Sequence, residues 1–295
     1  MVDLKDAIAD AMVQVIKLAA TRVRKDVRNL IAAAAKEETN QLARKQLEYL
    51  LQNFELAAKE CLPYCQDTGT IHVFGTIGEQ FPIRAGIYAA IEAGIVNATK
   101  TIPLRPNSVD PISETMKYKD NTGPGLPDVS LRVVPGDMLE LDVLLKGAGS
   151  ENMSKLVMLE PIGAKERIPG IVREYMINAG GKPCPPVIIG IGIGGSASTC
   201  MGIAKKSLLR EAGAPHPDPA THTLEIAIKD AVNSTGIGTM GLGGAITCLA
   251  VHVDTCARHP ASFPVGIVVQ CYAHRHARVR VEKDGYKTIP EEFYP

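Results

Sequence analysis

The 295-residue sequence predicts a mixed α/β (α+β) fold, in which a helical N-terminal part precedes a mixed sheet flanked by helices. Up to residue 60, apolar residues recur at three- and four-residue spacing, which is the period of an amphipathic helix. Beyond residue 61, short β-branched runs alternate with helical stretches and with turns rich in glycine and proline. Because no repeat or linker interrupts the chain, we expect one domain, with a helical part over 1–60, a core over 61–284 and a tail over 285–295.

Three helices are expected in the N-terminal part. The first has apolar residues on one face, and the second covers residues 25–36. The third carries a broad apolar face formed by Leu42, Leu47, Leu50, Leu51, Phe54 and Ala58. Acidic and basic residues nearly balance here, so this part is interpreted as a helical cap without a catalytic candidate.

In the core, strands and helices are expected to alternate. Ile71 and Val73 indicate a strand, and a helix follows over 84–100. Residues 129–134 and 138–145 alternate like two paired strands joined through Pro135-Gly136-Asp137. A helix is expected over 169–179, with its proline in the first turn. Further elements follow as a strand from 187, helices over 196–210 and 221–233, an ambiguous element over 246–254 and a strand over 265–270.

The strand, glycine turn and helix over 187–210 resemble an anion-binding arrangement, as found in dinucleotide sites. The glycines follow the pattern G-x-G-x-G-G, and no strand ending in an acid follows about twenty residues later to bind a ribose. A nucleotide-dependent oxidoreductase is therefore only a minor alternative.

The charge and hydropathy of the chain argue against two classes of partner. Lysine plus arginine and aspartate plus glutamate both total 32, so the formal net charge is zero, whereas nucleic-acid and anionic membrane surfaces require a basic excess. No apolar run approaches the roughly 20 residues that span a bilayer. The first six residues include acids, unlike a signal peptide. We expect no nucleic-acid partner, no membrane partner and a cytoplasmic location.

Three of the seven cysteines stand out by their setting. Cys65 lies in Pro-Tyr-Cys-Gln-Asp-Thr-Gly-Thr, Cys184 is flanked by prolines, and Cys271 ends an apolar strand. Thiolates on such stiff segments favour zinc, copper(I) or an iron–sulfur cluster. Cys200, Cys248 and Cys256 lie within or beside apolar segments and are more typical of buried thiols. Cys61 forms a C-x₃-C pair with Cys65, but no second pair at zinc spacing follows, so a zinc knuckle is not expected.

Two further stretches are candidates for binding an anion. Arg105 is embedded in a proline-rich loop, where its guanidinium could clamp a carboxylate, although a surface arginine in a loop is at least as common. The small residues of 146–152 expose backbone N–H groups.

Several segments together resemble one family, the α subunit of two-subunit class I fumarate hydratase, with the tartrate dehydratase α subunit as its sibling. The segments are PYCQDTGT, LRPNSVD, KGAGSEN, GGKPCPP with IGIGG, CARHPAS and QCYAHRHA, in the family's order between about residue 10 and residue 282. The resemblance implies a [4Fe–4S] hydro-lyase whose cluster is held by Cys65, Cys184 and Cys271, with one iron left open to act as a Lewis acid.

The resemblance also implies roles for the residues that line the substrate. Asp67 and His259 are the expected catalytic residues, as a proton relay. Substrate binding is expected from Gln66, Arg105, Gly147, Ala148 and Gly149. Among these, Ala148 departs from the glycine that is expected in many relatives.

A separate β subunit is implied as the partner that supplies the general base and completes the site, in an α₂β₂ assembly. The substrate is expected to be a C4 dicarboxylate. We favour reversible hydration of fumarate to L-malate, because LRPNSVD and KGAGSENMS look more like the fumarate hydratase loops. L-tartrate dehydratase is the alternative, followed by a non-catalytic iron–sulfur or redox protein.

Overall fold

The computed structural model describes residues 3–83, 85–290 and 293. The chain divides into two compact units: unit 1 comprises Met1–Lys25, Phe54–Gly147 and Arg275–Pro295, and unit 2 comprises Asp26–Asn53 and Ala148–His274. The mixed α/β class is confirmed, whereas the single domain stays a prediction. Arg84 and part of the expected tail, residues 291, 292, 294 and 295, lie outside the described residues.

The helical N-terminal part is present as expected, and the later helices fall near their predicted positions. The helices are α1 (Leu4–Thr21), α2 (Lys25–Glu37), α3 (Gln41–Glu60), α4 (Ile87–Thr101), α5 (Ala148–Glu151), α6 (Ala164–Ala179), α7 (Ala197–Ser207) and α8 (Pro219–Asn233), with a 3₁₀ turn at Thr239–Gly241. The strands are β1 (Thr70–Gly78), β2 (Asp128–Val134), β3 (Leu139–Lys146), β4 (Lys155–Leu159), β5 (Val187–Ile193), β6 (Cys248–Thr255), β7 (Phe263–Gln270), β8 (Arg275–Val281) and β9 (Lys287–Thr288).

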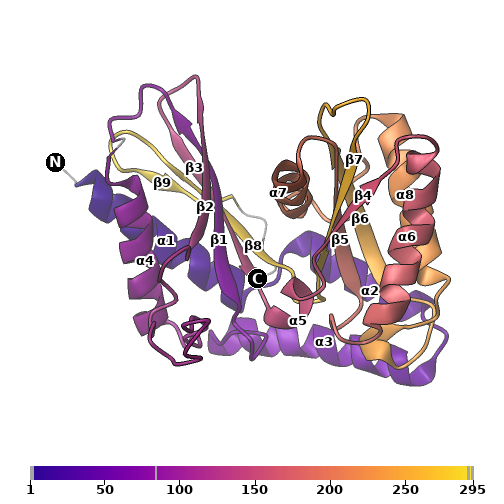
Figure 1. Ribbon diagram of the computed structural model, residues 1–295. Helices are drawn as coiled ribbons and strands as arrows, with labels where there is room; N and C mark the ends of the chain where they lie inside the picture. Colours follow the sequence, from indigo (N-terminus) through magenta and orange to yellow (C-terminus); the bar gives the residue numbers. More distant parts are fainter. Residues whose placement is uncertain (1–2, 84, 291–292, 294–295) are drawn as a thin grey trace. The chain divides into compact units, whose positions relative to one another are not determined.

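Unit 1 is built on a five-stranded sheet of order β2-β1-β3-β8-β9. Helices α1 and α4 pack side by side against this sheet (Figure 1). Their apolar faces, including Met12 and Ile91, meet Val73, Val143 and Val279 of the sheet in one fully buried core. The alternating strands thus place apolar side chains toward the helices, while intervening side chains such as His72 point to the other face.

The expected pairing of the two strands around Pro135-Gly136-Asp137 is wrong. Strands β2 and β3 do not form a hairpin, because β1 lies between them. Strand β1 runs parallel to β2 and antiparallel to β3. The connecting turn bonds to the end of β1 instead: Gly78 N donates to Met138 O, and Gln80 N donates to Gly136 O.

Unit 2 is built on a four-stranded sheet of order β4-β7-β5-β6, with α7 on one face and α6 and α8 on the other (Figure 1). Strands β5 and β7 are buried along their whole length, as expected for a sheet covered on both faces. Strand β4 was not expected from the sequence; its five residues are all exposed or half-buried.

Two local details of unit 2 correct the sequence-based interpretation. Helix α6 begins at Ala164, so Pro169 lies inside the helix and not in its first turn. In β5, a Cβ atom on Gly190 or Gly192 would overlap the backbone carbonyls of Ala204 or Cys200 in α7. These glycines let α7 pack closely on the sheet, which accounts for them without a bound nucleotide.

Candidate functional site

The loop between α3 and β1 carries three of the predicted site residues, Cys65, Gln66 and Asp67. Its start is anchored by Tyr64, whose N–H donates to Ala20 O at 3.1 Å and whose ring meets Phe54 edge-on. Cys65 and Asp67 are half-buried and Gln66 is exposed. Oδ1 of Asp67 accepts a hydrogen bond from Gly69 N at 2.9 Å, which turns the loop back on itself.

The loop that carries Arg105 is bonded directly to this one. Arg105 N donates to Thr68 Oγ1 at 2.9 Å, and Asn107 Nδ2 donates to Gly69 O at 3.0 Å. Asn121 fastens the far side, because its Nδ2 donates to Arg105 O and its Oδ1 accepts from Asn107 N. The guanidinium of Arg105 is exposed and makes no hydrogen bond to the described residues. Segments about forty positions apart are thereby joined, as a carboxylate clamp beside Asp67 requires.

Gly69 fits this loop against the end of β3. Its φ of +81° lies in the left-handed region, and a Cβ atom there would come within 2.7 Å of the Lys146 carbonyl carbon. Glycine is the residue that meets both demands.

The predicted anion-binding stretch continues from β3. Gly147 is buried beside Asp67, whereas Ala148 and Gly149 are exposed in the one-turn helix α5 of unit 2. A Cβ atom on Gly149 would lie 3.1 Å from Lys182 O, so this glycine borders the segment that leads to Cys184. Binding of a carboxylate by these three residues stays a prediction.

Cys184 and Cys271 are neighbours in unit 2, since Tyr272 N donates to Cys184 O at 3.3 Å. Cys184 is exposed, has a φ of +53° and lies between two buried prolines. Cys271 is buried at the end of β7. Cys65 belongs to unit 1, and among the described residues no group of three or more His, Cys, Asp or Glu is placed to hold a metal ion. Two cysteines at the ends of stiff segments, backbone to backbone, are nevertheless a donor set that fits iron or iron–sulfur.

His259 is exposed in the loop that follows β6. Its Nδ1 accepts a hydrogen bond from Ala261 N at 3.1 Å. This contact leaves the proton of the neutral ring on Nε2, the nitrogen that can exchange it with a neighbouring group. Because Asp67 lies in the other unit, the expected relay between the two residues stays a prediction.

Comparisons with known proteins agree with the motifs found in the sequence and with their order along the chain. The family described as "Fumarate hydratase (Fumerase)" matches residues 9–280. The chain belongs to the fumarate hydratase family. It is 40% identical over 281 residues to the "Putative L(+)-tartrate dehydratase subunit alpha" of Methanocaldococcus jannaschii, covering 94% of this chain and 98% of that protein.

It is also similar to the "L(+)-tartrate dehydratase subunit alpha" of Escherichia coli. The identity to the protein of strain K12 is 31% over 265 residues, covering 90% of this chain and 87% of that protein, and to that of strain UTI89 it is 32% over the same length. Membership of the fumarate hydratase family makes the chain a hydro-lyase, and confirms the resemblance found in the sequence. No helix within the described ranges is long and apolar enough to cross a membrane.

One residue of this fumarate hydratase family member was missed by sequence reasoning. Arg275 lies in the QCYAHRHA segment but is not among the site residues expected from the sequence; it is fully buried, and its Nη1 donates to the carbonyl of Asp67. Its place directly after the QCYAH stretch was the available signal. Alternation along a strand does not reveal which basic residue turns inward at the strand's end.

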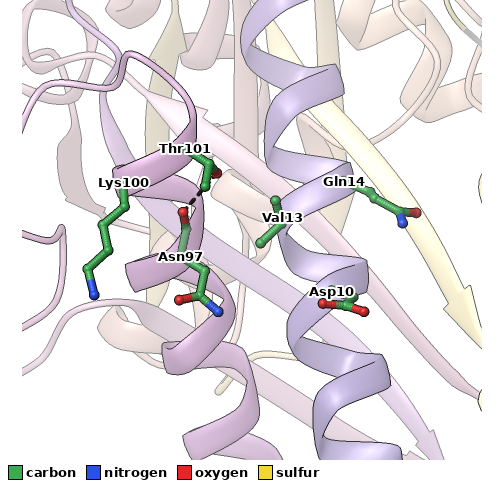
Figure 2. A pocket seen from close by; sticks show the side chains of 6 residues that line it. All are labelled: Asp10, Val13, Gln14, Asn97, Lys100 and Thr101. Carbon is green, nitrogen blue, oxygen red and sulfur yellow. Dashed lines mark hydrogen bonds between the residues drawn. The ribbon is translucent and has the colours of Figure 1, made fainter. Parts of the chain in front are cut away.

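A surface hollow lies elsewhere in unit 1, between α1 and α4 (Figure 2). It has a volume of about 350 Å³ and is lined by Asp10, Val13, Gln14, Asn97, Lys100 and Thr101. None of the predicted site residues lines it, so it is not the candidate active site.

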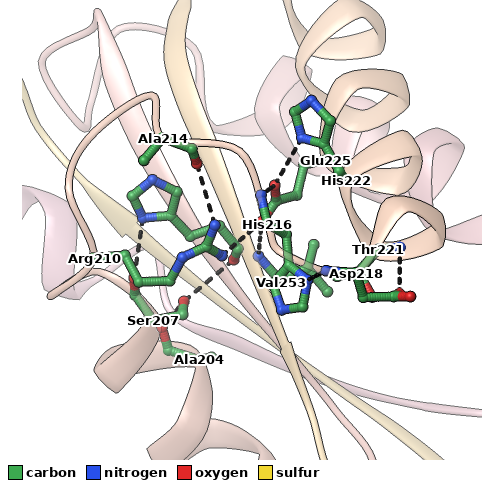
Figure 3. A network of polar contacts seen from close by, with 11 residues as sticks. Ala204, Ser207, Arg210, Ala214, His216, Asp218, Thr221, His222, Glu225 and Val253 are labelled. Carbon is green, nitrogen blue, oxygen red and sulfur yellow. Dashed lines mark hydrogen bonds and ion pairs between the residues drawn. The ribbon is translucent and has the colours of Figure 1, made fainter.

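Unit 2 contains a buried polar network outside the candidate site (Figure 3). The carboxylate of Glu225 accepts hydrogen bonds from Arg210 Nη1 at 2.7 Å and from Val253 N at 2.9 Å. Burial alone would raise the pKa of Glu225, but these donors outweigh it and hold the pKa below its ordinary value. Nearby, burial lowers the pKa of His252 to about 4, so its ring is neutral where its Nδ1 meets Ser207 O at 3.0 Å.

Proposed function

We propose that this hydro-lyase catalyses the reversible hydration of fumarate to L-malate. The observation that carries the proposal is the bonded junction of the two loops of unit 1, which holds the carboxylate of Asp67 and the exposed guanidinium of Arg105 on one framework. Hydration of a C4 diacid needs a cation to hold its carboxylates and groups that relay a proton, which are the roles expected of Arg105 and Asp67.

The remaining residues take the roles that the family resemblance assigns to them. Arg105 and the backbone of Gly147, Ala148 and Gly149 bind the carboxylates, and the exposed amide of Gln66 orients the substrate. Asp67 and His259 hold and move the proton. Ala148 replaces the expected glycine without penalty if the contact is made by its backbone, since its side chain is exposed.

Cys65, Cys184 and Cys271 would hold a [4Fe–4S] cluster. When bound, this group supplies a Lewis acid for the departing or entering hydroxide. The neighbouring backbones of Cys184 and Cys271 support the assignment, as does the softness of three thiolate donors.

A separate β subunit would complete the active site and supply the general base, in an α₂β₂ assembly. The relatives are named as alpha subunits, which supports a partner for this chain as well. A cytoplasmic location stays a prediction.

L-tartrate dehydration is the second candidate, and the names of the relatives favour it. A non-catalytic iron–sulfur protein is the third and would need neither Arg105 nor His259. The decisive experiment is co-expression with the β partner and anaerobic cluster reconstitution, followed by assays on fumarate, L-malate and L(+)-tartrate.

Two variants test the role of Arg105 in that assay. Arg105→Ala should raise the KM for the preferred diacid about 10- to 100-fold, because a charge-assisted, bidentate contact is lost. Arg132→Ala removes another exposed arginine of unit 1 and should leave KM unchanged. Equal kinetics of Arg105→Ala and the wild type would show that Arg105 is not the clamp.

A further inference from the structure

Arg275 is the largest fully buried side chain in the described part of the protein. It begins β8, where it pairs with Leu145 of β3, and its Nη1 donates to the carbonyl oxygen of Asp67. A buried guanidinium is costly unless an anion compensates its charge. A backbone carbonyl carries no net charge, so this bond orients Arg275 without neutralising it.

The other two guanidinium nitrogens, Nε and Nη2, are buried and find no hydrogen-bond partner among the described residues. Their N–H bonds lie on the same edge of the planar group and point in nearly the same direction. This edge is the one that binds both oxygens of a carboxylate at once. The unsatisfied part of Arg275 is therefore a complete carboxylate fork.

The next arginines of the same strand behave differently. Arg278 Nε donates to Asp142 at 2.8 Å, and Arg280 Nε donates to Glu140 at 2.7 Å. Both therefore have a carboxylate of β3 as counter-ion. In the described chain Arg275 forms no such ion pair, although it is the most deeply buried of the three.

Gly147 borders this fork and the catalytic carboxylate at once. A Cβ atom on Gly147 would lie 3.4 Å from Arg275 Nη2 and 3.0 Å from Asp67 Oδ2. Both distances are short for a Cβ contact, so glycine at this position, where the predicted anion-binding stretch begins, lets the backbone lie against the fork and the carboxylate together.

We propose that the Nε and Nη2 edge of Arg275 binds a carboxylate of the substrate, beside Asp67 and in addition to Arg105. The inference rests on the proposed function, because it takes a C4 dicarboxylate as the ligand. It adds the buried Arg275 to the exposed Arg105 as a second cation bonded to the Asp67–Thr68 segment.

The test uses the reconstituted enzyme with its β partner and the variants Arg275→Gln, Arg275→Lys and, as the matched control, Arg278→Gln. For each variant, kcat and KM are measured with the preferred diacid. The inhibition constant of succinate, a C4 dicarboxylate that cannot be hydrated, is also measured. Iron, sulfide and the absorbance spectrum report the cluster independently of activity.

Arg275→Gln should raise both KM and the succinate inhibition constant about 10- to 100-fold while the cluster content is unchanged. Arg275→Lys keeps the positive charge but not the two parallel N–H donors, so its KM and succinate inhibition constant should lie between those of Arg275→Gln and the wild type. Should the Gln variant fail to fold, the Lys variant decides. The KM and succinate inhibition constant of Arg278→Gln should stay within about 2-fold of wild type, because this arginine is not part of the proposed carboxylate site.

A fall in kcat or in cluster content with KM and succinate inhibition unchanged would overturn the proposal, because Arg275 would then only support the Asp67 loop. If the wild type turns over none of the diacids, the proposed function fails. Calorimetric titration with succinate then judges this inference separately, and equal affinity or no binding in wild type and Arg275→Gln refutes it.

Discussion

The two units hold their predicted site residues in different ways. In unit 1, the loop with Asp67 and the loop with Arg105 are cross-linked by Thr68 and Asn107, and Asn121 fastens the far side of the Arg105 loop. In unit 2, Cys184 and His259 are exposed on loops, and each is held by backbone contacts or by contacts to its immediate neighbours.

This difference indicates which part of the site is preorganised by the chain alone. The cross-linked loops of unit 1 fix the groups that would bind the diacid before any ligand arrives. The thiols of unit 2 sit on stiff segments, but their final geometry would be set when a cluster is bound. Substitutions in unit 1 should therefore affect substrate binding, and those at the cysteines should affect the cofactor.

The largest effect is expected from Cys184→Ser. Loss of one of three cluster ligands should lower turnover by at least about 1,000-fold and reduce iron and sulfide content, with the folded structure kept. The control is Cys61→Ser, another exposed cysteine that lies outside the predicted set. Iron analysis and circular dichroism of both variants check the expectation, and a full cluster in Cys184→Ser would contradict the ligand assignment.

A smaller but still large effect is expected in unit 1 from Gly69→Ala. The new Cβ would press on the backbone of Lys146 in a strained conformation, which should cost about 2–4 kcal/mol and displace Asp67. Gly125→Ala is a close match, because Gly125 has a φ of +80° but nothing within 4 Å of its Cβ position. Denaturant titration should show a clearly greater loss of unfolding free energy for Gly69→Ala than for Gly125→Ala. Equal losses in the two variants would argue against the close contact at Gly69.

In unit 2, Glu225→Gln tests whether the buried network serves stability and not substrate binding. The neutral amide leaves the Arg210 guanidinium without its counter-ion and should lower the free energy of unfolding by about 3 kcal/mol. KM should not change. Glu211→Gln, at an exposed position of the same unit, is the control and should alter stability by less than about 0.5 kcal/mol. A KM that rises with Glu225→Gln would assign the network to the site.

Local periodicity was sufficient to predict most helices and strands, because both depend on neighbouring side chains. The placement of β1 between β2 and β3 was not predictable, since it depends on contacts between distant segments. Pro169 was misplaced for a related reason: Ala164 begins the helix and packing of α6 on the sheet outweighs the proline.

The candidate site shows the same division. The motifs indicated Cys184 and Cys271 separately, and the fold makes them neighbours. They did not indicate Asn107 as a cross-link or Arg275 as a buried cation. Burial of a charged residue depends on what the rest of the chain places around it, which no local pattern contains.

The smallest effect concerns pH and distinguishes the units again. The pKa of His252 in unit 2 is lowered to about 4 by burial, so the folded chain resists its protonation. Between pH 6.5 and about 4 the unfolded chain binds the extra proton, and stability therefore falls as the pH falls, by about 2 kcal/mol between pH 7 and pH 5.

In unit 1, burial would raise the pKa of Asp142, but hydrogen bonds from His276 and Arg278 outweigh it and lower the pKa. The stability that comes from the lowered pKa of Asp142 is fully present at pH values above the ordinary pKa of a carboxyl group. It is lost only at more acidic pH, outside the range between pH 7 and pH 5 in which His252 acts. His252→Asn, whose amide can still donate to Ser207 O, should flatten the pH dependence between 7 and 5. Denaturant titrations at both pH values measure this, and an unchanged slope in His252→Asn would assign the acid sensitivity to another group.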